Sequence, residues 1–216
     1  LQAAMQGKLT KQLPEDGNAE ELLDQIKAEK ERLIAEGKIK KQKPLAPIAD
    51  DETPFSVPEN WEWVRLESII SFIGDKSNQI KESDVKEEGT FPVVSQSKEK
   101  IIGYCDDENK VVFVDEPVLV FGDHTALIKY IDFDFIVGAD GVKIMKPIII
   151  NPFYLYYALT YNLIGISSIG GYSRHYKFIK DKLIPIPPQK EQERIVDKLS
   201  NSMQDINAVG ELIASE

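Results

Sequence analysis

Hydrophobic positions recur at helical spacing near both ends of the chain. Residues 19–36 carry apolar side chains at steps of three and four among charged ones, which predicts an amphipathic helix ended by Gly37. Residues 1–13 carry a shorter stripe and are expected to be the end of another helix. From residue 189 onward the spacing becomes seven, in two offset series that predict a helix able to enter a coiled coil. The series are Ile195, Ser202 and Val209, and Leu199, Ile206 and Ile213.

The middle of the chain has a different pattern. Short β-branched and aromatic runs alternate with Gly, Asp and Asn, which predicts strands joined by turns. The expected strands are 91–95, 111–114, 118–121, 126–131, 133–138 and 141–145. Residues 152–163 are expected to form a helix, because Asn151 suits the N-cap and Pro152 the first helical position. The sequence therefore predicts an α+β fold.

These patterns divide the chain into three parts. A helical region with a linker covers 1–57, a mixed α/β domain covers 58–188, and a single helix covers 189–216. The linker contains lysines, an acidic trio and four prolines, a composition typical of irregular structure. We expect the flanking helices to pack as an antiparallel coiled coil or helical bundle. Because the chain begins with Leu1 rather than Met, we also expect it to be preceded by the start of a longer protein.

Composition narrows the class of protein. With 216 residues, of which 42% are hydrophobic, the chain can bury one full core. The single Cys105 excludes an intrachain disulfide framework and fits a reducing compartment. No apolar run approaches the roughly 20 residues that span a bilayer. We therefore expect a cytoplasmic protein that does not enter a membrane.

Charge is distributed unevenly along this acidic chain. The net charge is -10, yet residues 171–182 contain four Lys/Arg and one Asp, about +3. The same segment carries tyrosines and glycines. Cations that meet phosphates, with aromatic or planar groups beside them, are typical of nucleic-acid surfaces. We interpret this segment as part of a surface that contacts double-stranded DNA.

Three loops supply candidate DNA contacts after predicted strands and in the basic segment. Two-pronged donors and acceptors suit base edges, which favours Gln96, Asp123 and Arg174 as base contacts. Glycines in these loops would let the backbone approach the duplex closely. The candidates are Ser95, Gln96, Ser97, Lys98, Gly122, Asp123, His124, Thr125, Gly171, Tyr172, Ser173, Arg174, His175, Tyr176 and Lys177.

Three other functions fit parts of the sequence. Residues 151–154 (Asn-Pro-Phe-Tyr) resemble the Asn-Pro-Pro-Tyr/Phe motif of adenine amino-methyltransferases, although the second proline and a Gly-rich cofactor loop are missing. A protein-binding scaffold would use the terminal helices alone. A nuclease could hold Mg²⁺ on carboxylates. Its candidate residues are Asp123, His124, Asp132, Asp134 and Asp140, of which Asp140 begins an Asp-Gly pair that also favours a hairpin turn.

The chain resembles the specificity subunit of type I restriction-modification enzymes over essentially its whole length. The resemblance is carried by LQAAMQGKLT at the start, PFSVPENWEWVRLESI before the domain, FGDHTALIKYIDFDFIVGADGVKIMKP inside it and GYSRHYKFIKDKLIPIPPQKEQERIVDKL at its end. The most distinctive part is the pattern Pro-Pro-x-x-Glu-Gln-x-x-Ile. It is formed by Pro187, Pro188, Glu191, Gln192 and Ile195.

This resemblance implies a non-catalytic subunit that recognises a split DNA target. It implies methyltransferase subunits that hold S-adenosylmethionine, and restriction/translocase subunits that use ATP and Mg²⁺, so that no cofactor or metal site is expected on this chain. The family pattern has two target-recognition domains, whereas one is present here. The chain is thus expected to be a fragment of a longer subunit or a half-subunit that forms a homodimer, which would recognise a palindromic split site.

Overall fold

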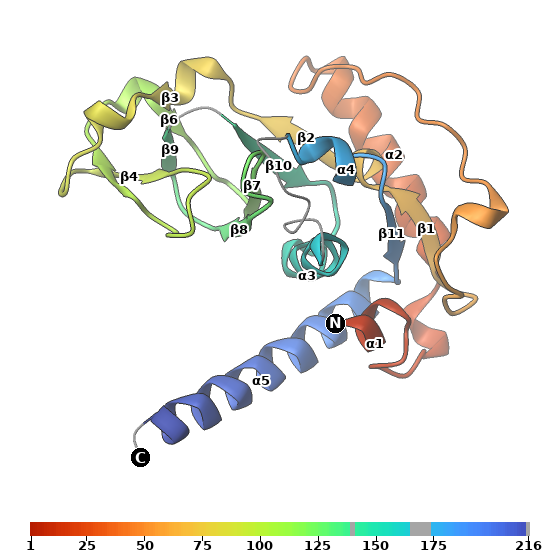
Figure 1. The fold of residues 1–216 in the computed structure, drawn as a ribbon. Helices are drawn as coiled ribbons and strands as arrows, with labels where there is room; N and C mark the ends of the chain where they lie inside the picture. Colours follow the sequence, from red (N-terminus) through yellow and green to blue (C-terminus); the bar gives the residue numbers. More distant parts are fainter. Residues whose placement is uncertain (139–140, 165–173, 215–216) are drawn as a thin grey trace.

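The computed structural model describes residues 1–138, 141–164 and 174–214, with side chains through residue 202 apart from that of Asp50. Helices and strands mix along the chain, as the predicted α+β class requires (Figure 1). The helices are α1 (Gln2–Met5), α2 (Ala19–Ala35), α3 (Pro152–Leu163), α4 (Tyr176–Ile179) and α5 (Gln189–Ala214). The strands are β1 (Glu62–Arg65), β2 (Ile70–Ile73), β3 (Gln79–Ile80), β4 (Phe91–Val94), β5 (Gly103–Cys105), β6 (Val111–Val112), β7 (Val118–Gly122), β8 (Ile128–Ile131), β9 (Phe135–Gly138), β10 (Val142–Pro147) and β11 (Leu183–Ile186).

The described strands form three sheets. An antiparallel sheet has the order β2-β10-β7-β8, and a mixed sheet has the order β3-β9-β4-β5, with β6 also paired to β9. A third pair, β1 with β11, joins the beginning and the end of the central region in an antiparallel register that matches Trp63 with Pro185. The chain therefore enters and leaves the domain at one place, beside the start of α5 (Figure 1).

Strand β7 is buried on both faces of its sheet, which explains why its side chains are all apolar. Its successive side chains point to opposite faces of the sheet, and both faces are covered. Leu119 and Phe121 belong to the core that the helices complete, whereas Val118 and Val120 belong to the core between the two larger sheets. A strand buried on both faces lacks the alternation that a half-exposed strand shows.

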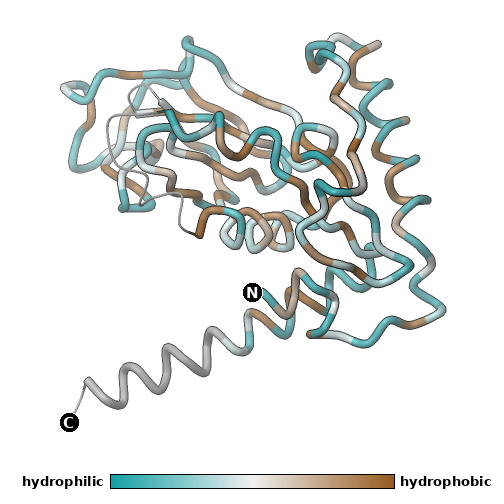
Figure 2. The backbone as a smooth tube through the Cα atoms, turned by 45° about the vertical axis from the view of Figure 1, so that its right-hand side comes forward, coloured by the Kyte–Doolittle hydropathy of each residue, from teal (hydrophilic) through white to brown (hydrophobic). Residues whose placement is uncertain are grey.

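The N-terminal helices share the core of the central domain. Met5 of α1 and Ile26 of α2 are buried in the same cluster as Ile70 of β2 and Leu155 of α3. Figure 2 shows hydrophobic and hydrophilic positions alternating along α2, as an amphipathic helix requires. The predicted boundary between residues 57 and 58 therefore does not separate two hydrophobic cores, and the three-part division stays a prediction.

Helix predictions near the N-terminus have mixed outcomes. The helix expected at 19–36 is confirmed as α2, with the Asn18 side chain accepting a hydrogen bond from the amide of Glu21 as an N-cap. The helix expected through residue 13 is wrong, because α1 ends at Met5. Gly7 has φ of +66°, and a Cβ there would lie 2.3 Å from Cγ of Pro58. The chain turns at Gly7 to pack against Pro58, at the start of the central domain, and the helix ends before this turn.

Each expected strand overlaps an observed one, although the strand expected at 133–138 begins only at Phe135 and one turn prediction after it is wrong. Strand β8 ends at Ile131, and the Asp134 carboxylate accepts a hydrogen bond from the amide of Val114 at 2.7 Å before β9 begins. The hairpin expected at Asp140-Gly141 is not formed, because β9 and β10 belong to different sheets. Asp140 itself lies outside the described residues.

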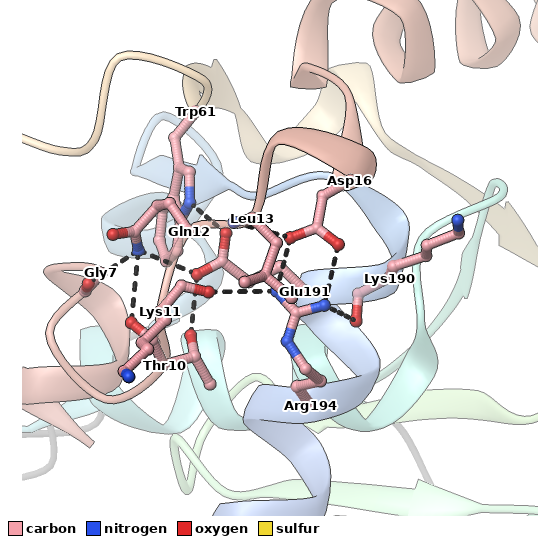
Figure 3. A network of polar contacts seen from close by, with 10 residues as sticks. All are labelled: Gly7, Thr10, Lys11, Gln12, Leu13, Asp16, Trp61, Lys190, Glu191 and Arg194. Carbon is pink, nitrogen blue, oxygen red and sulfur yellow. Dashed lines mark hydrogen bonds and ion pairs between the residues drawn. The ribbon is translucent and has the colours of Figure 1, made fainter.

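A buried carboxylate joins three distant segments at the start of α5. Glu191 is 0% exposed, and its two oxygens accept three hydrogen bonds (Figure 3). The donors are the Thr10 hydroxyl at 2.7 Å, the Gln12 amide at 3.0 Å and the Trp61 indole N–H at 2.9 Å. The N-terminal segment, the first residues of the central domain and α5 are thereby fixed to one side chain.

The neighbouring residues of α5 complete this junction. Gln192 is also 0% exposed; its oxygen accepts from the amide of Asn151, and its nitrogen donates to the carbonyl of Pro187. One turn later, Arg194 forms two hydrogen bonds to the carboxylate of Asp16, at 2.8 and 2.5 Å (Figure 3). The hydrogen bond from Arg194 lowers the pKa of Asp16. The Glu-Gln pair of the distinctive pattern is therefore structural.

A half-buried charge joins α2 to the domain. Lys30 donates to the Gln42 side chain at 2.8 Å, to the Glu67 carbonyl and to the Ser68 carbonyl at 3.2 Å. Burial disfavours its charged form and lowers its pKa to about 8.

Replacing Glu191 with Gln should lower the free energy of unfolding by about 3 kcal/mol. Glutamine presents one acceptor and one donor group, so at least one of the three donors would face an N–H₂ group instead of an oxygen. Urea unfolding followed by fluorescence measures the change. The exposed Glu193→Gln on the same helix is the control and should change stability by less than about 0.5 kcal/mol. Equal stability of the two variants would contradict this role of Glu191.

Lys30 should make stability depend on pH in a defined window. The folded-state pKa of about 8 lies below the ordinary lysine value of 10.5, so the unfolded chain binds more protons between these values. The free energy of unfolding should therefore rise from pH 8 to pH 10.5 through this group. Urea unfolding across this pH range should show that the free energy of unfolding of wild type rises relative to that of Lys30→Met. The exposed Lys27→Met is the control and should follow the wild-type profile.

Candidate nucleic-acid interface

The three loops predicted to contact DNA meet in the folded chain. We call their described part the three-loop cluster, which consists of residues 95–98, 122–125 and 174–177. The first segment follows β4, the second begins at the last residue of β7, and the third leads into α4. Gly171, Tyr172 and Ser173 lie outside the described residues. The first and third loops are 76 positions apart in the sequence, from residue 98 to residue 174, and the fold brings them together.

Gln96 connects the first two loops. Its side-chain oxygen accepts a hydrogen bond from the amide of His124 at 3.1 Å, and its backbone carbonyl accepts from the Thr125 hydroxyl at 2.8 Å. A Cβ at Gly122 would lie 2.8 Å from Cβ of Gln96, and one at Gly141, where φ is +82°, would lie 3.1 Å from its side-chain nitrogen. Both glycines are thus required for the close approach of the loops.

Asp123 connects the second loop to the third. Its carboxylate accepts from the amide of Tyr176 at 2.8 Å, and its carbonyl accepts from the amide of His175 at 2.6 Å. The His175 ring places Nδ1 3.0 Å from the same carbonyl, which favours the tautomer with the proton on Nδ1. The amide of Asp123 donates to the carbonyl of Gly141 at 2.6 Å. Asp123 therefore holds α4 and β10 against the loop.

The turn that carries the second loop is strained. Ala126 has φ of +53°, a left-handed conformation that is costly for a residue with a Cβ. Gly122 closes the turn twice, through its amide to the Leu127 carbonyl at 2.8 Å and through its carbonyl to the Ala126 amide at 2.9 Å. The surrounding hydrogen bonds maintain this geometry.

Buried and exposed members of the cluster have different roles. Asp123 and His175 are each 5% exposed; the Asp123 carboxylate accepts from the Tyr176 amide, and Nδ1 of His175 contacts the Asp123 carbonyl. Lys98, Arg174 and Lys177 are exposed. Direct contact of Asp123 or Gln96 with a base stays a prediction; in this structure their acceptor groups bind neighbouring loops. Contact of the three exposed cations with phosphates or guanine edges also stays a prediction.

Two lysines of this region were missed by the sequence analysis. Lys143 of β10 lies over the Tyr176 ring, with its Nζ 4.7 Å from the ring centroid, and also faces Phe72 at 5.8 Å. Lys129 of β8 is 8% exposed and donates to the carbonyl of Ser95 at 2.7 Å. A lysine in an otherwise apolar strand was the available signal for Lys129, whereas the position of Lys143 depends on the packing of α4.

The methyltransferase-like residues have a structural explanation. The Asn151 side chain accepts hydrogen bonds from the amides of Phe153 and Tyr154, at 3.0 and 3.1 Å, so it caps α3 as predicted. The Phe153 ring stacks on Tyr130 with centroids 3.9 Å apart. The Tyr154 hydroxyl donates to the carbonyl of Pro185, and burial raises the pKa of Tyr154. These contacts account for the segment without base flipping.

The described carboxylates considered for a nuclease do not gather into a site, and Asp140 lies outside the described residues. Asp123 and Asp134 accept backbone hydrogen bonds in different loops, and Asp132 lies 3.8 Å from the Lys100 ammonium. Within residues 1–138, 141–164 and 174–202, no three His, Cys, Asp or Glu side chains are placed to share a metal ion. In the same part of the chain, no helix has the length and apolar character needed to cross a membrane.

Comparisons with known proteins identify the family. The family model described as "Type I restriction modification DNA specificity domain" matches residues 58–214. The specificity subunits of the type I restriction enzymes EcoAI and EcoEI from Escherichia coli are each 32% identical to this chain. The alignments cover 99% and 94% of this chain, but 40% and 38% of those subunits. The chain thus spans about two fifths of the length of these relatives.

Solved structures show the same fold. A chain of a type I R-M system, solved for its complex assembly and conformational transition, superposes with a TM-score of 0.60 at 22% identity and covers 91% of this chain and 52% of that one. The HsdS subunit from Thermoanaerobacter tengcongensis gives a TM-score of 0.56 at 21% identity, over 90% of this chain and 51% of that subunit. The sequence match and the relatives together show that this chain belongs to the type I restriction-modification specificity-subunit family.

Proposed function

We propose that this chain recognises double-stranded DNA and contributes one half-site of a split target. The supporting observation is the three-loop cluster, in which exposed Lys98, Arg174 and Lys177 project from loops held by buried hydrogen bonds. A rigid arrangement of donors is what base recognition requires, because misplacing a contact by about 1 Å removes much of its energy. The relatives named as specificity subunits favour the same function.

The chain itself makes or breaks no covalent bond in this proposal. Methyltransferase subunits dock on its helices and supply S-adenosylmethionine, and restriction/translocase subunits supply ATP and Mg²⁺ chemistry. All of these subunits act in the cytoplasm. Helix α5 projects away from the body and is available for such docking, or for an antiparallel coiled coil (Figure 1).

A second recognition domain completes the split target in this proposal. It comes either from a second copy of this chain or from a longer subunit of which this chain is a part. Two copies related by a two-fold axis would recognise a palindromic sequence, whereas two different domains would recognise an asymmetric one. The symmetry of the methylated sequence distinguishes these arrangements.

Arg174→Ala should lower affinity for the target by about 1–3 kcal/mol and relax specificity at one base pair. The target is first identified as the motif methylated in cells that express this chain with its methyltransferase. Binding isotherms on matched and singly mismatched duplexes, at two salt concentrations, then measure affinity and the salt slope.

Lys177→Ala, in α4, is the comparison variant. If Lys177 meets a phosphate, affinity for all duplexes falls alike and the salt slope flattens by about one unit. If Arg174→Ala lowers affinity equally for matched and mismatched duplexes, Arg174 is not a base contact. Absence of any methylated motif and of any salt-dependent duplex binding would refute the proposed function.

A further inference from the structure

The loop after β4 is held at both ends by one ammonium group. Nζ of Lys129 donates to the carbonyl of Ser95 at 2.7 Å and to the carbonyl of Glu99. Between these ends, the carbonyl of Gln96 accepts from the Thr125 hydroxyl at 2.8 Å. Three carbonyls of this five-residue loop (the 95–99 loop) are therefore satisfied by side chains from the segment that leaves β7 and enters β8.

The burial of Lys129 is costly and calls for a physical reason. The residue is 8% exposed, and among the residues that the structure describes it forms no ion pair. Burial lowers the pKa of Lys129, because a charged ammonium loses its water there. An apolar side chain would fill a strand position between Ile128 and Tyr130 at a lower cost. What Lys129 adds is a set of directed hydrogen bonds to the loop.

These hydrogen bonds set where the exposed part of the loop lies. Ser95 is 6% exposed, and Gln96 is packed on Gly122, so the base of the loop cannot shift without breaking buried contacts. Lys98, at the far side, is exposed. Lys129 Nζ binds both ends of the loop, and the Ser97 hydroxyl also donates to the Glu99 carbonyl at 3.4 Å. The direction of Lys98 therefore depends in part on Lys129.

We infer that Lys129 is a positioning residue for DNA specificity, which fixes the 95–99 loop against a base pair without touching the DNA itself. This inference rests on the proposed function and deepens it, because it names a buried determinant of sequence discrimination. It also separates two possible roles of a lysine, which the exposed fraction of the side chain alone does not separate. A lysine that binds phosphate strengthens binding to every sequence, whereas a lysine that orients a loop changes the preference among sequences.

Lys129→Met keeps the length and the apolar stem of the side chain but removes its hydrogen bonds. The ratio of affinities for the methylated motif and its single-substitution duplexes should fall about tenfold at the base pair that the loop meets. The salt slope should stay at the wild-type value, because a buried ammonium releases no counterions from DNA. Isotherms with the full chain and its methyltransferase subunits, at two salt concentrations, measure both quantities.

Two further variants make the result decisive. Thr125→Val removes the donor to the Gln96 carbonyl and should lower the same ratio in the same direction. Lys100→Met removes a neighbouring ammonium whose side chain is 52% exposed, and it should leave the ratio unchanged. Circular dichroism and thermal unfolding establish that each variant is folded.

Each outcome bears on the inference. An unchanged ratio in folded Lys129→Met, or a flattened salt slope with equal loss on all duplexes, would overturn it. If Lys129→Met does not fold, an unchanged ratio in Thr125→Val overturns it instead. If wild type itself shows no preference among duplexes, the proposed function fails and the inference fails with it. If wild type shows a preference and both Lys129→Met and Thr125→Val retain it, only the inference is refuted.

Discussion

The buried carboxylate of Glu191 is the interaction on which the arrangement of this chain depends. A charge without water is tolerated only when donors satisfy it, and here the donors come from the N-terminal segment and from the entry of the central domain. Glu191 lies in the first turn of α5, so the direction of that helix is set relative to the N-terminal segment and to the entry of the central domain. In a protein proposed to recognise a split target, this direction decides where a second domain can stand.

A related principle applies to the half-buried Lys30 and the buried Lys129. Each is a cation held mainly by carbonyl oxygens of a loop on another element. A buried charge leaves few acceptable geometries, because every lost partner is expensive, whereas apolar contacts allow small displacements. Buried charges therefore fix loops more narrowly than hydrophobic packing does. The candidate interface places its exposed cations on loops fixed in this way.

The acidity of the whole chain is compatible with this interface because the relevant charge is local. Acidic residues such as Asp106 and Asp115 lie on other loops, where each pairs with a lysine and has a lowered pKa. Lys98, Arg174 and Lys177 are brought to one region by Gln96 and Asp123. Affinity for DNA would thus respond to a few residues, while the net charge limits binding to other polyanions.

The sequence by itself determined the fold class, helix α2, the cap of α3 at Asn151 and the expected strands. It also indicated the three loops of the candidate site. These features depend on local periodicity and on hydrogen bonds between residues close in the chain. It could not show that α1 stops where Gly7 meets Pro58, or that β9 and β10 enter different sheets. Only the tertiary structure decided that Asp123 faces inward and that Lys129 binds the 95–99 loop. Such contacts join residues far apart in the chain, and no local pattern encodes which distant carbonyl a side chain will meet.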